Sequence, residues 1–372
     1  MYTGPLKGLC TFGEVNSSIK HPDSIERKAL FMYHCSLERM SDKIHTFSKF
    51  GDAGHGGITR YALSAEDKMA RDEWVKRMTA IGATIETDDL ANMYATIPGS
   101  DPNAKRIVMG SHCDSVKNGG NYDGILGVMS AMEVLETVVA ENIPHKHPLT
   151  AMIFTNEEGS EFPPCMMCSG TMAHDYMPER FRDNFAYDKM MASHSILETE
   201  VTFGEKLAKF PYRGDKANRM SPDKYVALFE THIEQGPILD AEGISIGAVE
   251  NLQGISWQRV TIQGVANHAG TTPTAMRIDA GLAAAKVNVF MRDRCLQSGG
   301  KTVCTVGTMA FEPNAVNVIP SQAVFTVDVR SPYEDQLKAE EQALADYLRH
   351  QGDTLAADYG NPTGQGRIAI GP

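Results

Sequence analysis

This sequence of 372 residues lacks an apolar run as long as a membrane span, although 42% of its residues are hydrophobic. Its first residues, Met1 to Lys7, lack the basic and apolar segments of a secretory signal. We therefore expect a globular, cytoplasmic protein that does not bind a membrane. The length is sufficient for two domains, each with a hydrophobic core of its own.

Basic residues are also in deficit, because 35 Lys and Arg stand against 47 Asp and Glu, for a formal net charge of −12. A charge of that sign repels nucleic acid, so we expect no nucleic-acid partner. The seven cysteines are an odd number, and without a secretory signal we expect reduced thiols. Cys165 and Cys168 have the spacing of a redox or zinc pair, but no second pair completes such a site.

Helices and strands alternate over residues 1–237, which we predict to form an α/β domain. Apolar positions three and four residues apart predict helices at 23–50 and 64–81 and a third after Gly124. β-Branched and apolar runs predict strands at residues 83–87, 92–97, 106–111, 149–155 and 225–230.

The pattern changes over residues 238–352, which we predict to form a separate, smaller α+β domain. The expected elements are strands at 245–249, 255–262, 302–309 and 323–329 and helices at 280–294 and 333–350. Apolar and polar residues alternate along these strands, as in an antiparallel sheet with one open face. Residues 353–372 have no clear period.

Polar clusters follow three of the strands predicted in the first domain, and open α/β sheets place their chemistry at such strand ends. The clusters and an adjoining glycine-lined loop carry the residue types of a zinc-class site: His112, Asp123, Glu157, Glu158 and His232. Asp114 stands two residues after the first histidine, so we expect its carboxylate to accept the free imidazole N–H and to fix the tautomer.

The adjacent carboxylates of Glu157 and Glu158 cannot point the same way from an extended chain, which predicts divided roles. One would bind metal, while the other would take the proton of the attacking water. The alternative interpretation of Glu157 and Glu158 is a solvated charge pair.

Several motifs resemble, in order and spacing, the amidase/hydantoinase/carbamoylase family of metal-dependent amidohydrolases. They are Gly110–Ser115 with Gly119–Gly124, Asn156–Gly159, His232–Pro237, Asn267–Pro273 and Pro313–Pro320. The family includes N-carbamoyl-L-amino-acid hydrolase, β-ureidopropionase and allantoate amidohydrolase, within the aminoacylase and dimeric metallopeptidase superfamily. The resemblance implies a phosphorylase/hydrolase-like catalytic domain with a mixed sheet, interrupted by a ferredoxin-like dimerisation or lid domain.

The resemblance also implies two metal ions per subunit, zinc or manganese. His112, Asp123 and His232 would hold one ion, and Asp123 would bridge to a second ion that Glu158 also holds. Glu157 would be the general base. The implied reaction converts a small carbamoyl or ureido substrate with a carboxylate into amine, ammonia and carbon dioxide, in a homodimer formed through the lid domain.

The remaining implied roles fall on the substrate. His268 would stabilise the tetrahedral oxyanion, although a surface-loop histidine is the alternative interpretation. Gln235, Asn317 and Arg330 would hold the substrate, with the guanidinium gripping its carboxylate. For Arg330 the alternative is an ordinary charge at a strand end.

One departure from the family concerns the second metal ion. Family members have a late histidine that completes its site, whereas no histidine follows His350 here. We therefore expect the carboxyl end of the catalytic domain to be missing, with residues 353–372 as a divergent remnant. Two rival hypotheses are a non-catalytic homologue that dimerises and binds metal or a carboxylate ligand, and a peptidase or aminoacylase of the superfamily. Gln235, Asn317 and Arg330 favour the carbamoylase branch over the peptidases.

Overall fold

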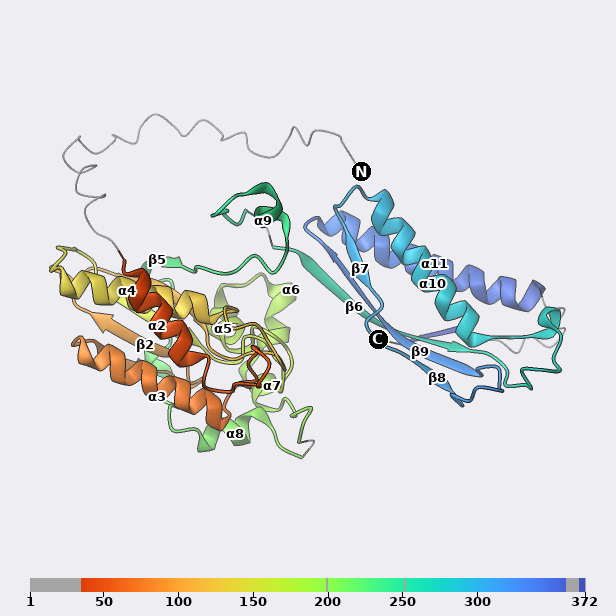
Figure 1. Cartoon of the computed structure of the whole chain (residues 1–372), viewed down its shortest axis with the longest axis horizontal. Helices are drawn as coiled ribbons and strands as arrows, with labels where there is room; N and C mark the ends of the chain where they lie inside the picture. Colours follow the sequence, from red (N-terminus) through yellow and green to blue (C-terminus); the bar gives the residue numbers. More distant parts are fainter. Residues whose placement is uncertain (1–34, 199, 251, 359–367, 372) are drawn as a thin grey trace. The chain divides into compact units, whose positions relative to one another are not determined.

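The computed structural model describes residues 35–198, 200–250, 252–358 and 368–371. The chain divides into two compact units, Met1–Ile238 and Leu239–Pro372. In Figure 1 the colours of the described residues run from red to green in the first unit and from green to blue in the second. In the described part of the chain, no helix has the length and apolar character needed to cross a membrane.

The first unit contains a mixed five-stranded sheet with the order β1-β2-β4-β3-β5. Its strands are β1 (Thr84–Thr87), β2 (Met93–Ile97), β3 (Arg106–His112), β4 (Leu149–Phe154) and β5 (Tyr225–Phe229). β3 pairs in parallel with both β4 and β5, while β1, β2 and β4 pair antiparallel. The three parallel strands therefore end at one edge of the sheet, where the polar clusters were predicted to meet.

Apolar side chains cover both faces of this sheet. The three longer helices pack on one face: α2 (Leu37–Phe47), α3 (Ala65–Ala80) and α4 (Ile125–Ala140). Trp74, Val128 and Met132 lie fully buried in that core. On the other face, Tyr94 and Met152 are fully buried. Because every residue of β4 is buried, this strand reads as a continuous apolar run rather than an alternating one.

Short helices separated by irregular segments lie between β4 and β5. They are α5 (Met167–Ala173), η1 (His174–Tyr176), α6 (Glu179–Arg182), η2 (Asp183–Phe185), α7 (Tyr187–Met191), α8 (Phe203–Lys209) and η3 (Lys216–Asn218). The predicted helix at 23–50 is described only from residue 35, and there α2 begins at Leu37 behind an N-cap from Ser36. The part of that prediction before residue 35 lies outside the described residues.

The second unit is an antiparallel sheet with the strand order β10-β6-β9-β7, and β8 also pairs with β9. Its strands are β6 (Gly254–Gln263), β7 (Val303–Thr305), β8 (Met309–Glu312), β9 (Gln322–Ser331) and β10 (Ile368–Gly371). Its helices are α9 (Ile238–Glu242), which starts at the unit boundary, η4 (Thr274–Met276), α10 (Ala280–Gln297) and α11 (Glu334–Asp358). Buried and partly exposed residues alternate along β9, as the sequence predicted for a sheet covered on one face.

Three expectations for this unit need correction. Residues 245–249 form no strand, and the side chains of Ile246 and Val249 are 88% and 80% exposed. An alternating stretch becomes a strand only when a neighbouring strand can pair with it. The single strand expected at 302–309 is two short ones, and the expected remnant, 353–372, instead supplies the end of α11 and β10, which pairs with β6.

Candidate metal centre

His112 ends β3 with only 2% of its side chain exposed. Its Nδ1 lies 2.9 Å from the backbone carbonyl oxygen of Asp114, whereas the Asp114 carboxylate is 4.0 Å away. The expected carboxylate partner of the imidazole is therefore a carbonyl. The consequence is the same, because a donor role for Nδ1 leaves the Nε2 lone pair free for a metal ion. Nε2 lies 3.6 Å from Glu157 and 4.0 Å from Asp123.

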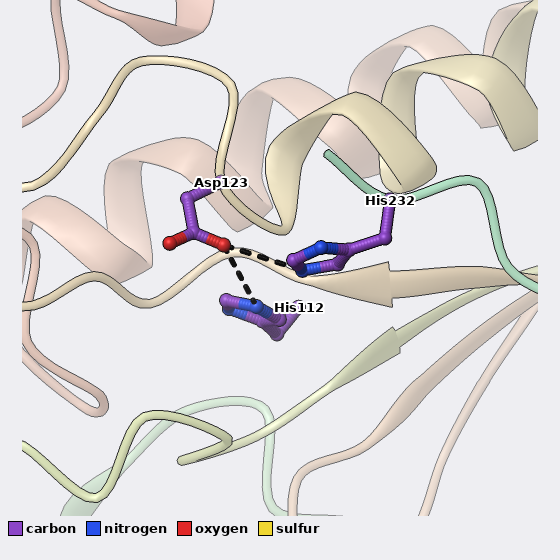
Figure 2. Close-up of side chains that lie close together, drawn as sticks. All are labelled: His112, Asp123 and His232. Carbon is purple, nitrogen blue, oxygen red and sulfur yellow. Dashed lines mark ion pairs between the residues drawn. The ribbon is translucent and has the colours of Figure 1, made fainter. Parts of the chain in front are cut away.

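Asp123 lies in the glycine-lined loop before α4 and faces both histidines (Figure 2). Its Oδ1 is 3.2 Å from His232 Nε2 and 4.0 Å from His112 Nε2. This buried oxygen therefore lies between the two imidazoles. Its Oδ2 accepts a hydrogen bond of 2.6 Å from the amide of Gln235, which joins that predicted substrate residue to the cluster.

Gly124 is a requirement of this geometry that the sequence reasoning missed. Its φ of +66° favours glycine, and a Cβ here would lie 2.3 Å from Cε1 of His112. The loop can therefore close over the imidazole only without a side chain at this position. In the sequence, the position of Gly124 directly after the predicted ligand Asp123 could have indicated this requirement.

His232 follows β5, and the backbone ladder between β3 and β5 stops at the pair Met109 and Phe229. Beyond it, Ser111 Oγ donates a 2.5 Å hydrogen bond to Glu230. A Cβ on Gly127 would lie 2.6 Å from the Thr231 carbonyl oxygen, so α4 also packs closely there. These side-chain and glycine contacts, which no motif in the sequence predicted, align the segment that carries His232.

Glu157 and Glu158 both lie beside His112, contrary to the sequence argument that they would point apart. Ligand atoms of the three residues are within 4.8 Å of one another. The argument was wrong because the chain is not extended here: Asn156 has φ of +53°. The turn aims two consecutive amides at Asp114, whose carboxylate accepts bonds of 3.2 Å from Glu157 N and 3.0 Å from Glu158 N.

Crowded acids shift the ionisation of the centre. Burial raises the pKa of Glu157, and burial with neighbouring carboxylates raises the pKa of Glu158 to about 7. Pairing with Asp123 raises the pKa of His232 to about 9, and the same pairing lowers the pKa of Asp123. Burial lowers the pKa of His112, but the charges of Asp114 and Glu157 outweigh that effect and raise it overall. A cation at this place would relieve the repulsion among the carboxylates.

The donor set fits one metal ion and offers oxygens for a second. His112, Asp123 and His232 form one group with ligand atoms within 4.8 Å, and His112, Glu157 and Glu158 form another. Imidazole nitrogen with carboxylate oxygen suits zinc and, with more oxygen, manganese. The buried Asp123 Oδ1 faces the Nε2 atoms of both histidines, so a cation bound between these three groups would take the place of the ion pair with His232.

The predicted residues His268, Asn317 and Arg330 belong to the second unit. The motifs around the first two lie side by side, because His268 bridges Val318 and Ala269 N donates to Asn317 O over 2.9 Å. The side chain of Arg330 is 41% exposed. Its guanidinium donates two hydrogen bonds to the Asp328 carboxylate, over 3.1 Å from Nε and 2.9 Å from Nη2.

Part of each unit matches the model of a known protein family. Residues 92–227 match the model of peptidase family M28, and residues 251–354 match the peptidase dimerisation domain. The N-carbamoyl-L-amino-acid amidohydrolase of Rhizobium meliloti is 36% identical over 303 residues, which cover 82% of this chain and 69% of the relative. The allantoate amidohydrolase of Bacillus subtilis (strain 168) is 31% identical over 299 residues, or 80% of this chain and 70% of that protein.

Solved structures agree. The hydantoinase/carbamoylase family amidase of Burkholderia multivorans is 34% identical with a TM-score of 0.77, covering 91% of this chain and 77% of its own. The corresponding enzyme of Burkholderia vietnamiensis is 35% identical with a TM-score of 0.72, covering 91% and 76%. This chain therefore belongs to the hydantoinase/carbamoylase family of amidases, which are hydrolases of carbon–nitrogen bonds in linear amides.

Proposed function

We propose that this protein hydrolyses an N-carbamoyl or ureido amino acid, or allantoate, to amine, ammonia and carbon dioxide with the help of bound metal. The observation that carries the proposal is the convergence of His112, Asp123 and His232 around a buried carboxylate oxygen of Asp123, with Glu157 and Glu158 alongside. The names of the relatives from Rhizobium meliloti and Bacillus subtilis support this class of substrate.

In this proposal His112, Asp123 and His232 hold one ion, and Asp123 and Glu158 hold a second. Zinc is the expected metal and manganese is the alternative. When bound, such ions polarise a carbonyl and lower the pKa of water. The carboxylate of Glu158 would then share the centre with His112 and Glu157, whose ligand atoms form one group with its own.

Glu157 is the proposed general base. Its side chain is 32% exposed, so water reaches it, and burial raises the pKa of its carboxyl above the usual value. A raised pKa gives the carboxylate of a general base a higher affinity for the proton that it takes. Glu157 takes the proton of the attacking water and delivers it to the leaving nitrogen. Asp114 holds Glu157 in place through the backbone amide and is thus a positioning residue.

Substrate contacts complete the proposal. Gln235 reaches the centre through its bond to Asp123, while His268 stabilises the oxyanion and Asn317 binds the substrate from the dimerisation domain. Arg330 grips the substrate carboxylate with the fork that now holds Asp328, because the two acids have the same planar geometry. The match to a dimerisation domain supports a homodimer formed through residues 238–352, and the absence of a nucleic-acid partner and the cytoplasmic location stay predictions.

The test combines metal content per chain with ammonia release from 3-ureidopropionate, N-carbamoyl amino acids and allantoate. We expect turnover of one of these, and a fall in kcat of about 10²–10⁴-fold in Glu157→Gln with metal content unchanged. Glu198→Gln, the same change at an exposed site, is the matched control. Full metal content without ammonia from any of the three would overturn the substrate class, and no bound metal would favour the non-catalytic homologue.

A peptidase or aminoacylase activity is the second candidate, because residues 92–227 match peptidase family M28. Dipeptides and N-acetyl amino acids assayed in parallel separate the two. Release of amino acid from these substrates, with no ammonia from ureido compounds, would select the second candidate.

A further inference from the structure

The second unit contains a pair of cysteines outside the metal centre. Cys295 lies in the last turn of α10 and Cys304 lies in the middle of β7. Their Sγ atoms are 2.7 Å apart, and both residues are partly exposed. Cys304 Sγ also donates to the Met291 carbonyl oxygen over 3.0 Å, so the thiols lie in the contact between helix and strand.

The chain between these cysteines is closed by its own hydrogen bonds. Ser298, the C-cap of α10, donates from Oγ to the Cys295 carbonyl oxygen over 2.7 Å and accepts from Thr302 N over 3.1 Å. Gly299 and Gly300 supply the two positive φ angles, +67° and +85°, of the reversal. The backbone therefore brings the two residues together independently of any bond between their sulfurs.

The strand side of the pair is equally well held. Cys304 pairs with Val329 in the ladder between β7 and β9, and Val329 is fully buried in the core of this unit. Met291 packs in the same core. Neither cysteine can move away from the other without disturbing the sheet or the helix end.

We propose that Cys295 and Cys304 form a reversible disulfide by exchange with a small-molecule disulfide such as oxidised glutathione. One cysteine thiolate attacks a sulfur of the reagent and releases one thiolate, which leaves a mixed disulfide on the protein. The second cysteine thiolate attacks the sulfur of the first cysteine in this mixed disulfide, forms the bond between the two cysteines and releases the reagent's second thiolate. The protons lost by the two cysteines end on the released thiols, so the cysteines are oxidised by two electrons and the reagent is reduced by two.

The bond would join the end of α10 to β7 and restrict the unfolded chain of the dimerisation domain. Burial and the neighbouring thiol raise the pKa of Cys295 to about 12. Oxidation is therefore expected to be slow at neutral pH and faster in mildly alkaline solution, because the thiolate is the attacking species.

The test treats the full chain with oxidised glutathione in mildly alkaline solution, alkylates the free thiols and maps the peptides by mass spectrometry. We expect the peptides of Cys295 and Cys304 joined with the loss of two hydrogens, and a melting temperature higher by on the order of 5 °C. Both effects should vanish on reduction and in Cys304→Ser, and both should persist in Cys35→Ser.

Cys35 is exposed and reports within the same sample whether the oxidant has acted. A glutathione adduct on Cys35 with Cys295 and Cys304 both alkylated would overturn the proposal. An adduct that stays on Cys295 or Cys304 without being displaced by the other would overturn it as well. A joined pair with an unchanged melting temperature would overturn the stabilising role of the bond.

Discussion

His112 and His232 contribute imidazoles to the same cluster, but His112 is 2% exposed and ends a strand, whereas His232 is 32% exposed and follows one. Buried backbone and the Asp114 carboxylate hold the first side of the centre. The second side depends on a few contacts beyond the end of a ladder. We infer from this difference that the first side is a preformed half of the centre and that the second is held by fewer contacts. Substitutions on the two sides should therefore differ in how far they lower stability and in how far they lower metal affinity.

The largest expected effect on stability is on the buried side. Asp114→Ala removes a buried carboxylate and leaves the amides of Glu157 and Glu158 without their acceptor. We expect the free energy of unfolding to fall by about 3–5 kcal/mol and the metal to be lost. Asp114→Asn keeps one acceptor oxygen, so its free energy of unfolding should lie between those of Asp114→Ala and the native chain. Chemical denaturation measures both, and a native stability for Asp114→Ala would contradict a preformed half.

A somewhat smaller effect should come from pH. Although burial opposes ionisation of Glu133, hydrogen bonds from Arg39 and Lys43 hold its pKa at about 2, below the usual 4.5. Because the folded pKa is lowered, this stabilisation is complete above about 4.5 and is lost as pH falls towards 2. On the order of 3 kcal/mol should disappear over that window.

Glu133 lies on α4, the helix that begins directly after the loop of Asp123. Protonation of Glu133 at low pH should therefore destabilise the part of the fold that holds the buried side of the centre. The control is Glu133→Gln, with its free energy of unfolding measured over the same pH range. Its stability should be lower at neutral pH but depend less steeply on pH below 4.5. An identical slope in both proteins would assign the acid sensitivity to other groups.

The glycine at the join of the two sides should have a moderate effect. Gly124→Ala places a Cβ against the His112 ring and forces alanine into a left-handed conformation, which together should cost about 2 kcal/mol or more. Gly120→Ala, in the same loop, meets nothing within 4 Å and should be close to neutral. Thermal unfolding and metal titration of the two variants compare them directly, and equal effects would refute the close approach.

The smallest effect on stability should come from the exposed side. Glu230→Ala removes the bond from Ser111 and should lower stability by at most about 1 kcal/mol. It should weaken metal affinity about 10–100-fold, because His232 loses its alignment. The double variant with Ser111→Ala should be no worse than either single one. Additive losses of metal affinity would mean that the two residues act separately.

Much of the first unit could be predicted from the sequence because its signals are local. β-Branched runs, glycine stops and caps such as Ser64 specify strands and helices over a few residues. Polar residues directly after such strands must meet at one edge when the strands are parallel, and His112, Glu157 and His232 do. In the second unit, the alternation along β9 predicted its covered face.

Other features depend on residues distant in sequence, and only the tertiary structure decided them. The two glutamates face the same histidine because Asn156 turns the chain and Asp114, more than 40 residues earlier, captures both amides. Residues 245–249 stayed irregular and β10 joined β6 because pairing needs an available strand edge, which local pattern does not encode. The sequence by itself thus determined which side chains could bind metal, while packing between distant segments determined which atoms face one another.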